Sequence, residues 1–235
     1  MTEALYQTDS YLKEFTAQVV DVDSDNNAVI LDRTAFYPGG GGQPNDAGEL
    51  IAGDTRYIVR KVARGGLHII DGDLPPVGTA VKGVLDWDRR YKLMRTHTAM
   101  HILCGVIWRD YGASVTGGNM DPLKGRMDFE FERMQKELVQ EIENSINVEV
   151  AAARDVQVNI LPRDEAFQIP DLIRTKINLL PEGITEVRTV EIIGLDLQAD
   201  GGTHVANTRE VGRIRVTDYK SKGGINKRIY VELDE

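Results

Sequence analysis

The chain has 235 residues, of which 41% are hydrophobic, so it can bury one large core or two modest ones, and we expect two domains. Its formal net charge of -9 argues against general nucleic-acid binding, because phosphate contacts favour a basic surface, although a local basic patch is not excluded. The single cysteine, Cys104, excludes an intrachain disulfide framework and cysteine-rich zinc modules, and we interpret it as a buried core residue.

The first part of the chain is rich in short strand patterns. Six runs are apolar or alternate apolar with polar residues, and Asp, Asn, Gly and Pro separate them: residues 15–23, 27–32, 48–53, 55–63, 66–71 and 79–86. Their spacing predicts a small β-barrel domain over residues 1–87. His68 belongs to one of these runs and has no ligand-type partner nearby in the sequence, so we interpret it as a strand or hairpin histidine.

Helical periodicity begins after this region. From about Asp88 to Asp110, apolar residues recur at steps of three and four, which predicts a long helix, and a second helix is predicted near 132–153. Strand candidates lie around these helices at residues 125–131, 155–161, 186–193, 212–218 and 228–233. Long helices mixed with alternating strands predict that residues 88–235 form an α+β two-layer sandwich.

The sequence also shows neither a predicted membrane-spanning helix nor a predicted secretion signal. No apolar run approaches the roughly 18 to 20 residues that a helix needs to span a bilayer. The N-terminal residues "MTEALYQTDSYLKEF" lack the basic and then apolar pattern of a secretion signal. We therefore expect a cytoplasmic protein with no membrane partner.

Three of the four histidines and one aspartate form a candidate metal site. His97 and His101 are four residues apart on the buried stripe of the predicted helix, so their imidazoles project side by side. In "QADGGTHVANT", Asp200 precedes His204 by four residues, and the two glycines between them would allow a tight turn. Three imidazoles and a carboxylate are a suitable donor set for Zn²⁺. An isolated pair of histidines four residues apart more often packs in the core without a metal. The presence of Asp200 and His204 as a second cluster favours the metal site.

Several segments resemble one family. "HTAMH" (97–101) and "DGGTHVANT" (200–208) resemble the HxxxH and CxxxH zinc signature of the alanyl-tRNA synthetase editing domain and of its free-standing relatives, the AlaX proteins. "TAFYPGGGGQPNDAG" (34–48) resembles the glycine-rich segment that opens those modules. Later blocks follow in the family's order: residues 124–131, 141–150, 186–194, 209–216 and 223–233. Because 235 residues leave no room for an aminoacylation domain, we expect the free-standing, medium-length type.

The resemblance implies a reaction. The protein would hydrolyse tRNA(Ala) mischarged with serine in trans, with glycine as a second candidate, and would spare Ala-tRNA(Ala). The bond to be cut is the ester between the amino acid carbonyl and the 3′-terminal ribose. Zinc would either polarise this carbonyl and activate water or mainly position the substrate, and the sequence does not choose between these. We assign no catalytic residue beyond the metal site.

Asp200 departs from the family pattern, which has cysteine at this position. A carboxylate has the same formal charge as a thiolate and is a harder ligand, so zinc binding remains chemically reasonable. We favour Asp200 as a ligand. The alternative is that it stays outside the ligand set and orients an imidazole.

Selection of serine over alanine needs a partner for the seryl hydroxyl, because such a partner is left unpaired when alanine enters the pocket. Thr116 follows the histidine helix at about the place where AlaX proteins have a serine-sensing threonine. Thr203, beside His204, is the second candidate.

The glycine run offers a further candidate for substrate binding. Gly40, Gly41, Gly42 and Gln43 would bring backbone N–H groups close to phosphate or ribose, and we favour them as a wall of an editing cleft between the two domains. A flexible turn of the barrel is the alternative. A P-loop is excluded, because the Lys-Ser/Thr that would follow is absent.

Two other classes of function stay open. One is a non-catalytic tRNA-binding module in which the metal is structural, and bound zinc without any deacylation would support it. The other is a zinc-dependent hydrolase of a small ester or amide. A steep salt dependence of tRNA binding would count against that second class.

Overall fold

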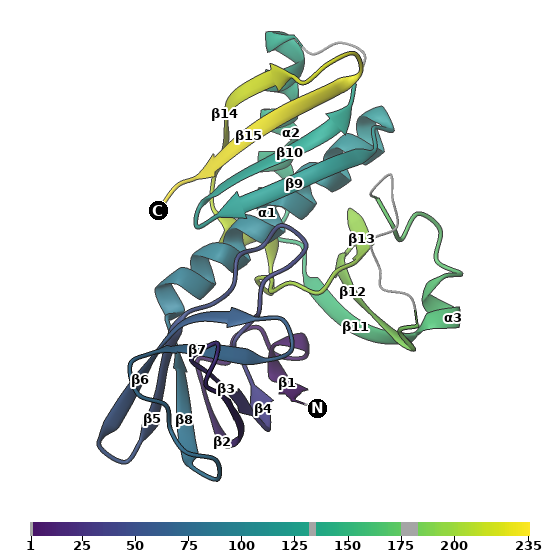
Figure 1. Ribbon diagram of the computed structural model, residues 1–235. Coiled ribbons are helices and arrows are strands. Elements are labelled where there is room, and N and C mark those ends of the chain that lie inside the picture. Colours follow the sequence, from purple (N-terminus) through teal and green to yellow (C-terminus); the bar gives the residue numbers. More distant parts are fainter. Residues whose placement is uncertain (1, 132–134, 175–182) are drawn as a thin grey trace. The chain divides into compact units, whose positions relative to one another are not determined.

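The computed structural model describes residues 2–131, 135–174 and 183–235. The chain divides into two compact units, Met1–Lys92 and Leu93–Glu235 (Figure 1). Helix α1, Trp87–Tyr111, contributes residues to both units. The expected domain boundary at residue 87 coincides with the start of this helix. That residues 1–87 and 88–235 are separate domains stays a prediction.

The first unit contains a closed barrel of six strands in the order β2-β3-β7-β6-β5-β8. The strands are β2 (Glu14–Asp23), β3 (Ala28–Leu31), β5 (Gly48–Ala52), β6 (Thr55–Ala63), β7 (Leu67–Asp71) and β8 (Ala80–Leu85). All neighbouring pairs are antiparallel. Each strand coincides with one of the six predicted runs to within one residue at either end, so the small β-barrel is confirmed. A short strand β1 (Glu3–Ala4) pairs in parallel with β4 (Arg33–Thr34), and the 3₁₀ turn η1 (Leu5–Gln7) follows β1.

The barrel closes over an apolar core because alternate strand residues point inward. Phe15 and Phe36 meet edge to face in this core, with ring centroids 5.6 Å apart. A Cβ at Gly83 would lie 2.3 Å from the ring of Phe15. The absence of a side chain at Gly83 therefore lets the phenylalanine fit inside.

Two buried polar groups are also built into the first unit. Arg90 is fully buried and donates to both carboxylate oxygens of Asp46 and to the carbonyl oxygens of Ser10 and Ala35. Asp46 in turn accepts from the backbone N–H of Tyr37, at 2.7 Å. The pair thus fixes the two ends of the glycine-rich segment to the start of α1.

In the second unit, one antiparallel sheet has four strands in the order β14-β15-β10-β9. These are β9 (Val115–Asp121), β10 (Lys124–Glu130), β14 (Ile214–Ser221) and β15 (Asn226–Leu233). Helices α1 and α2 (Lys136–Ala151) lie along one face of this sheet (Figure 1). On α2, the side chain of Asn147 both donates to and accepts from the backbone of Ile214 in β14. The second predicted helix is confirmed from residue 136, while residues 132–134 lie outside the described part of the chain.

A second antiparallel sheet has the order β11-β12-β13, with β11 at Val156–Pro162, β12 at Glu186–Ile192 and β13 at Asp196–Ala199. The short helix α3 (Arg163–Ala166) and the 3₁₀ turn η2 (Thr208–Val211) complete the described elements. A Cβ at Gly105 of α1 would lie 3.0 Å from Cβ of Asp196, so this glycine allows β13 to approach the helix closely. The described strands of this unit are divided between two sheets, and the single two-layer sandwich stays a prediction.

The five strands expected in the second unit correspond to β10, β11, β12, β14 and β15. Sequence reasoning missed β9 and β13. Among the helices in the described part of the chain, none is both long enough and apolar enough to cross a membrane.

Candidate metal centre

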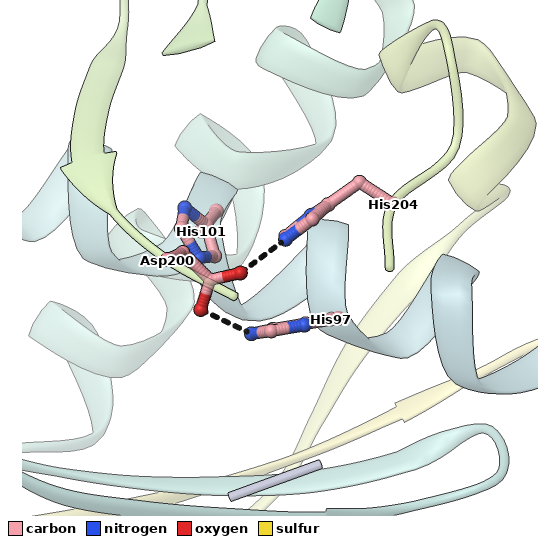
Figure 2. A group of neighbouring side chains, drawn as sticks. All are labelled: His97, His101, Asp200 and His204. Atoms are coloured by element: carbon pink, nitrogen blue, oxygen red, sulfur yellow. Dashed lines mark hydrogen bonds and ion pairs between the residues drawn. The ribbon is translucent and has the colours of Figure 1, made fainter. Parts of the chain in front are cut away.

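Helix α1 and the segment that follows β13 bring four candidate ligands together. His97 and His101 lie one turn apart on α1, and Asp200 and His204 come from the segment directly after β13 (Figure 2). The three imidazoles are each at most 5% exposed. The grouping that the sequence predicted is therefore formed in a buried part of the fold.

The ligand atoms of these four residues converge. One donor atom from each residue lies within 4.8 Å of the donors of the other three. Asp200 lies between two rings, with Oδ1 3.5 Å from Nε2 of His97 and Oδ2 3.1 Å from Nε2 of His204 (Figure 2). The ring centroids of His97 and His204 are 4.2 Å apart, and that of His101 is 4.7 Å from His204. A single cation is small enough to contact all four donors after minor side-chain adjustment.

The local backbone presents Asp200 to the rings. Its Oδ2 accepts from the backbone N–H of Gly202 at 2.6 Å, which closes an Asx-type turn. Arg188 of β12 donates to the carbonyl oxygen of Asp200 at 2.9 Å, and the backbone N–H of Asp200 donates to the carbonyl of Arg188. The carboxylate is therefore held by backbone contacts as well as by the imidazoles.

The electrostatics of the cluster favour the unprotonated state at three of the four donors, His97, Asp200 and His204. Burial lowers the pKa of His97 to about 4, against the opposing charge of Asp200. Burial, and then the neighbouring His97, hold the pKa of His204 well below its usual value. Burial alone would raise the pKa of Asp200, but the nearby imidazoles, first His97 and then His204, hold it well below the usual range. A carboxylate and neutral imidazoles are the protonation states that metal binding requires.

His101 differs from the other two. Burial would lower its pKa, but the hydrogen bond to the carboxylate of Asp196 and the charge of that group outweigh burial and raise it. Nδ1 of His101 lies 3.0 Å from Oδ2 of Asp196. Sequence reasoning missed Asp196. Its signal in the sequence is faint: an aspartate four residues before Asp200, in a strand of only four residues.

Thr98 is a second residue that sequence reasoning missed. Its hydroxyl oxygen lies 3.2 Å from Nδ1 of His204 and accepts from the backbone N–H of Val205, also at 3.2 Å. A threonine one residue after a histidine on an apolar helix face looks like core filling in the sequence. The contact that matters joins residues 106 positions apart.

Cys104 is buried on the same helix, and burial raises the pKa of its thiol well above the usual value. A protonated thiol is a poor metal ligand. The interpretation of Cys104 as a core residue is confirmed.

The two threonine candidates lie in different surroundings. Thr203 is fully buried and directly precedes His204. Thr116 is exposed on β9, and its hydroxyl donates to Oδ1 of Asn226 at 2.8 Å. Asn226 alternates with Lys227 and Ile229, which are buried, so Thr116 and Asn226 share the outer face of the sheet. Thr203 thus adjoins the cluster along the chain, and a role of either threonine in selecting serine stays a prediction.

The glycine run belongs to the first unit. Gly40 and Gln43 exchange backbone hydrogen bonds of 3.0 and 2.9 Å and close a tight turn. Gly40, Gly41 and Gly42 have φ angles of +139°, +57° and +91°, which favour glycine at all three positions. Gln43 is 2% exposed. An ordered turn fits these facts, and substrate binding by the four residues stays a prediction.

Comparison with known proteins points to one family. Residues 4–89 match the sequence family described as tRNA synthetases class II (A), and residues 187–230 match the threonyl and alanyl tRNA synthetase second additional domain. The chain is 44% identical to an alanyl-tRNA editing protein AlaX-M of Saccharolobus solfataricus, over 98% of each chain. It is 39% identical to an AlaX-M of Methanosarcina mazei, over 99% of this chain and 97% of the relative.

A different kind of relative is a full-length synthetase. An alanine--tRNA ligase of Ignicoccus hospitalis is 39% identical over 92% of this chain, but the match covers 24% of the ligase. The AlaX-M proteins, in contrast, match from end to end. The chain that carries this buried cluster, on α1 and in the segment after β13, therefore belongs to the AlaX family of free-standing alanyl-tRNA editing proteins.

Proposed function

We propose that the protein is an aminoacyl-tRNA deacylase that removes serine from mischarged tRNA(Ala) in trans and spares Ala-tRNA(Ala). The observation that carries this proposal is the convergence of four buried donor atoms within 4.8 Å, in a chain that aligns end to end with proteins named for alanyl-tRNA editing. Editing of a mischarged tRNA is hydrolysis of an ester, so the reaction class is that of a carboxylic ester hydrolase. Its cellular setting would be translation fidelity in the cytoplasm.

We propose Zn²⁺ as the metal. His97, His101, His204 and Asp200 form a donor set of three imidazoles and one carboxylate, which is typical of zinc and other divalent transition metals. When bound, the ion would supply a Lewis acid for the ester carbonyl and a water molecule, or would mainly position the substrate. The protein's own residues hold the donors in a site with little exposure to water, where electrostatic interactions are strong.

The position of Asp200 supports its assignment as a ligand. A carboxylate that orients a metal-bound histidine normally accepts from the ring nitrogen opposite the metal. Asp196 has that relation to Nδ1 of His101. Asp200 instead lies at Nε2 of both His97 and His204, on the side to which the donors point. A carboxylate therefore takes the place of the family's cysteine.

For the seryl hydroxyl we propose Thr203 as the partner in preference to Thr116. Thr203 is fully buried and directly precedes the candidate ligand His204, whereas Thr116 lies on an exposed sheet face. A buried hydroxyl that pairs with serine is left without that partner when alanine is bound, and this difference disfavours the cognate ester.

The proposed partner is mischarged tRNA(Ala). Matches to two tRNA synthetase families, over residues 4–89 and 187–230, support an RNA partner despite the acidic net charge. We retain the proposal that the backbone N–H groups of Gly40, Gly41, Gly42 and Gln43 contact a phosphate or ribose of the substrate, because the three glycines adopt positive φ angles and have no Cβ to keep a ligand from the backbone.

The deciding experiment measures deacylation of Ser-tRNA(Ala), Gly-tRNA(Ala) and Ala-tRNA(Ala) by the purified protein. It compares zinc-loaded protein, protein stripped by a chelator and stripped protein with zinc restored. We expect serine to be released by the first and third preparations and alanine to be spared. His68→Gln, which changes a buried histidine outside the cluster, is the matched control and should retain activity.

Other outcomes separate the alternatives. Zinc binding together with tight tRNA binding but no release of any amino acid would overturn the enzyme proposal and indicate a binding module. Hydrolysis of a small seryl ester at a rate equal to that of Ser-tRNA(Ala) would indicate a general esterase.

A further inference from the structure

Asp196 holds one of the histidines from behind. It is the first residue of β13, its side chain is fully buried, and its Oδ2 lies 3.0 Å from Nδ1 of His101. A carboxylate can only accept a hydrogen bond, so Nδ1 of His101 must carry the hydrogen. The lone pair of the neutral ring then lies on Nε2, the nitrogen left for the cluster.

Three neighbours hold Asp196 in this position. Nε2 of Gln198 donates to the same Oδ2 at 2.6 Å. Nε of Arg174 lies 3.6 Å from the other oxygen, Oδ1, and its guanidinium packs over the ring of Trp108 with 4.6 Å to the centroid. The glycine at position 105 leaves room for the Cβ of Asp196 against α1. The carboxylate is therefore ordered independently of the imidazole that it contacts.

His204 provides an internal comparison. Its Nδ1 faces the hydroxyl of Thr98, which can either donate or accept. Its Nε2 lies 3.1 Å from Oδ2 of Asp200 and donates to it in the metal-free protein. To bind a metal through Nε2, His204 must move its hydrogen to Nδ1, and Thr98 accommodates both states. His101 needs no such change, because Asp196 accepts in both.

We propose that Asp196 is the positioning residue of the metal centre: it locks His101 as the Nδ1–H tautomer and aims its Nε2 at His97, Asp200 and His204 before any metal binds. The inference rests on the proposed metal site, but Asp196 is not one of its four candidate ligands. It makes His101 a preformed ligand and leaves His204 to change tautomer on binding.

Asp196→Asn tests this directly, because it removes the charge and nearly keeps the size. If the amide NH₂ faces His101, it donates to Nδ1 and moves the hydrogen to Nε2, which then cannot bind the metal. If the amide oxygen faces His101, the NH₂ meets the Arg174 cation. Either arrangement should raise the dissociation constant of zinc by about 10- to 100-fold.

The matched control is Glu191→Gln. Glu191 lies in β12 of the same sheet, beside the register pair of Ile192 and Asp196, and its side chain is on the opposite face of that strand. The change of charge is the same, but it lies away from His101. Zinc affinity should stay within about twofold of the wild type.

The decisive measurement is the tautomer of His101 in the metal-free protein, from long-range ¹H–¹⁵N spectra at alkaline pH, with His101→Gln used to assign the signals. We expect Nδ1–H in the wild type and in Glu191→Gln. We expect a mixed or Nε2–H tautomer in Asp196→Asn, with the His204 signals unchanged. Zinc titration should convert His204, but not His101, to a new tautomer.

Two results would overturn the proposal: an Nε2–H tautomer of His101 in the wild-type protein, or wild-type zinc affinity and tautomer in Asp196→Asn. If Asp196→Asn does not fold, the wild-type spectrum still tests the tautomer of His101. Gln198→Leu then serves as the second variant: it removes the hydrogen bond to Asp196 and should also raise the dissociation constant of zinc. The proposed function fails separately, because zinc-loaded wild-type protein that shows the expected tautomers but leaves Ser-tRNA(Ala) intact refutes the deacylase and not the positioning of His101.

Discussion

His68 in the barrel and the three histidines of the second unit are all buried, but their ring nitrogens meet different partners. In His68, Nε2 lies 2.8 Å from the Thr34 hydroxyl, and Nδ1 lies 3.3 Å from the carbonyl oxygen of Val29. Both ring nitrogens face polar groups of the first unit and, among the described residues, no carboxylate. In the second unit, Nε2 of His97 and of His204 turn toward one shared carboxylate.

The difference teaches that burial alone does not distinguish a histidine with a structural role from a candidate metal ligand. Burial lowers the pKa of His68 and of His97 alike, to about 4 in each. The two differ in what their ring nitrogens face. Those of His68 face a hydroxyl and a carbonyl oxygen, whereas the cluster brings donor atoms of four residues within 4.8 Å of one another. Lone pairs that face one another are stabilised by a cation.

The largest expected effect, on zinc binding and on the deacylation rate, comes from replacing His204, and replacing His68 in a second variant is the comparison. His204→Gln should abolish stoichiometric zinc binding and reduce kcat/KM for Ser-tRNA(Ala) on the order of a thousandfold, because the metal's stabilisation of the transition state amounts to several kcal/mol. His68→Gln should leave both quantities within about twofold. Metal analysis and single-turnover deacylation of the two variants measure the difference. Zinc loss in His68→Gln, or full zinc retention in His204→Gln, would contradict the assignment of His204, and not His68, to the metal site.

The second prediction concerns the carboxylates. Asp46 faces the buried Arg90, so Asp46→Asn leaves an uncompensated cation and should lower the free energy of unfolding by about 3–5 kcal/mol. Zinc content should not change, unlike in Asp200→Asn. Urea unfolding and metal analysis check both statements. The double variant Arg90→Met with Asp46→Leu should recover most of the lost stability, and a double variant as unstable as Asp46→Asn would contradict a charge-based cost.

These pairs also show what a sequence can and cannot predict. The six barrel strands and the helix over His97 and His101 carry a local pattern of apolar residues, and the four-residue spacing of Asp200 and His204 lies within one segment, so each can be read from neighbouring residues. The partnership of Asp46 with Arg90 joins residues 44 positions apart and has no local pattern. Asp196 and Thr98 were missed for the same reason, since each meets its histidine only in the folded chain.

The two missed strands have a different cause. β9 contains Gly117 and Gly118, which weaken a strand pattern, and β13 has only four residues. Their formation depends on pairing with β10 and β12, which supplies the backbone hydrogen bonds. The serine-specific assignments came from resemblance to a family, because periodicity carries no information about a substrate.

The third prediction uses the pKa of His68. Its usual value of 6.5 is lowered to about 4 by burial in the folded barrel. Between these values the unfolded chain binds a proton that the folded chain does not, so the free energy of unfolding falls as the pH falls from 6.5 to 4. The loss should reach about 3 kcal/mol at pH 4 and be absent above about pH 7.5.

Comparison with His68→Gln isolates this contribution, because the histidines of the cluster titrate in both proteins. Urea unfolding of zinc-free protein should show a steeper loss of stability on acidification in the wild type. Parallel curves would mean that His68 takes up its proton within the folded barrel.

The smallest expected effect concerns the choice between the two threonines. Thr203→Val should slow deacylation of Ser-tRNA(Ala) by about 10- to 100-fold with zinc content unchanged, because a hydrogen bond to the seryl hydroxyl is worth about 1–3 kcal/mol in a buried site. Thr116→Val removes a hydroxyl that donates to Asn226 on an exposed face, so it should change the rate by less than about twofold. Single-turnover rates for Ser-tRNA(Ala) and Gly-tRNA(Ala) decide, because the glycine ester has no hydroxyl and should respond to neither change. A serine-specific loss in Thr116→Val alone would return the sensing role to β9, as the sequence first indicated, and would mean that the substrate reaches the outer face of the sheet.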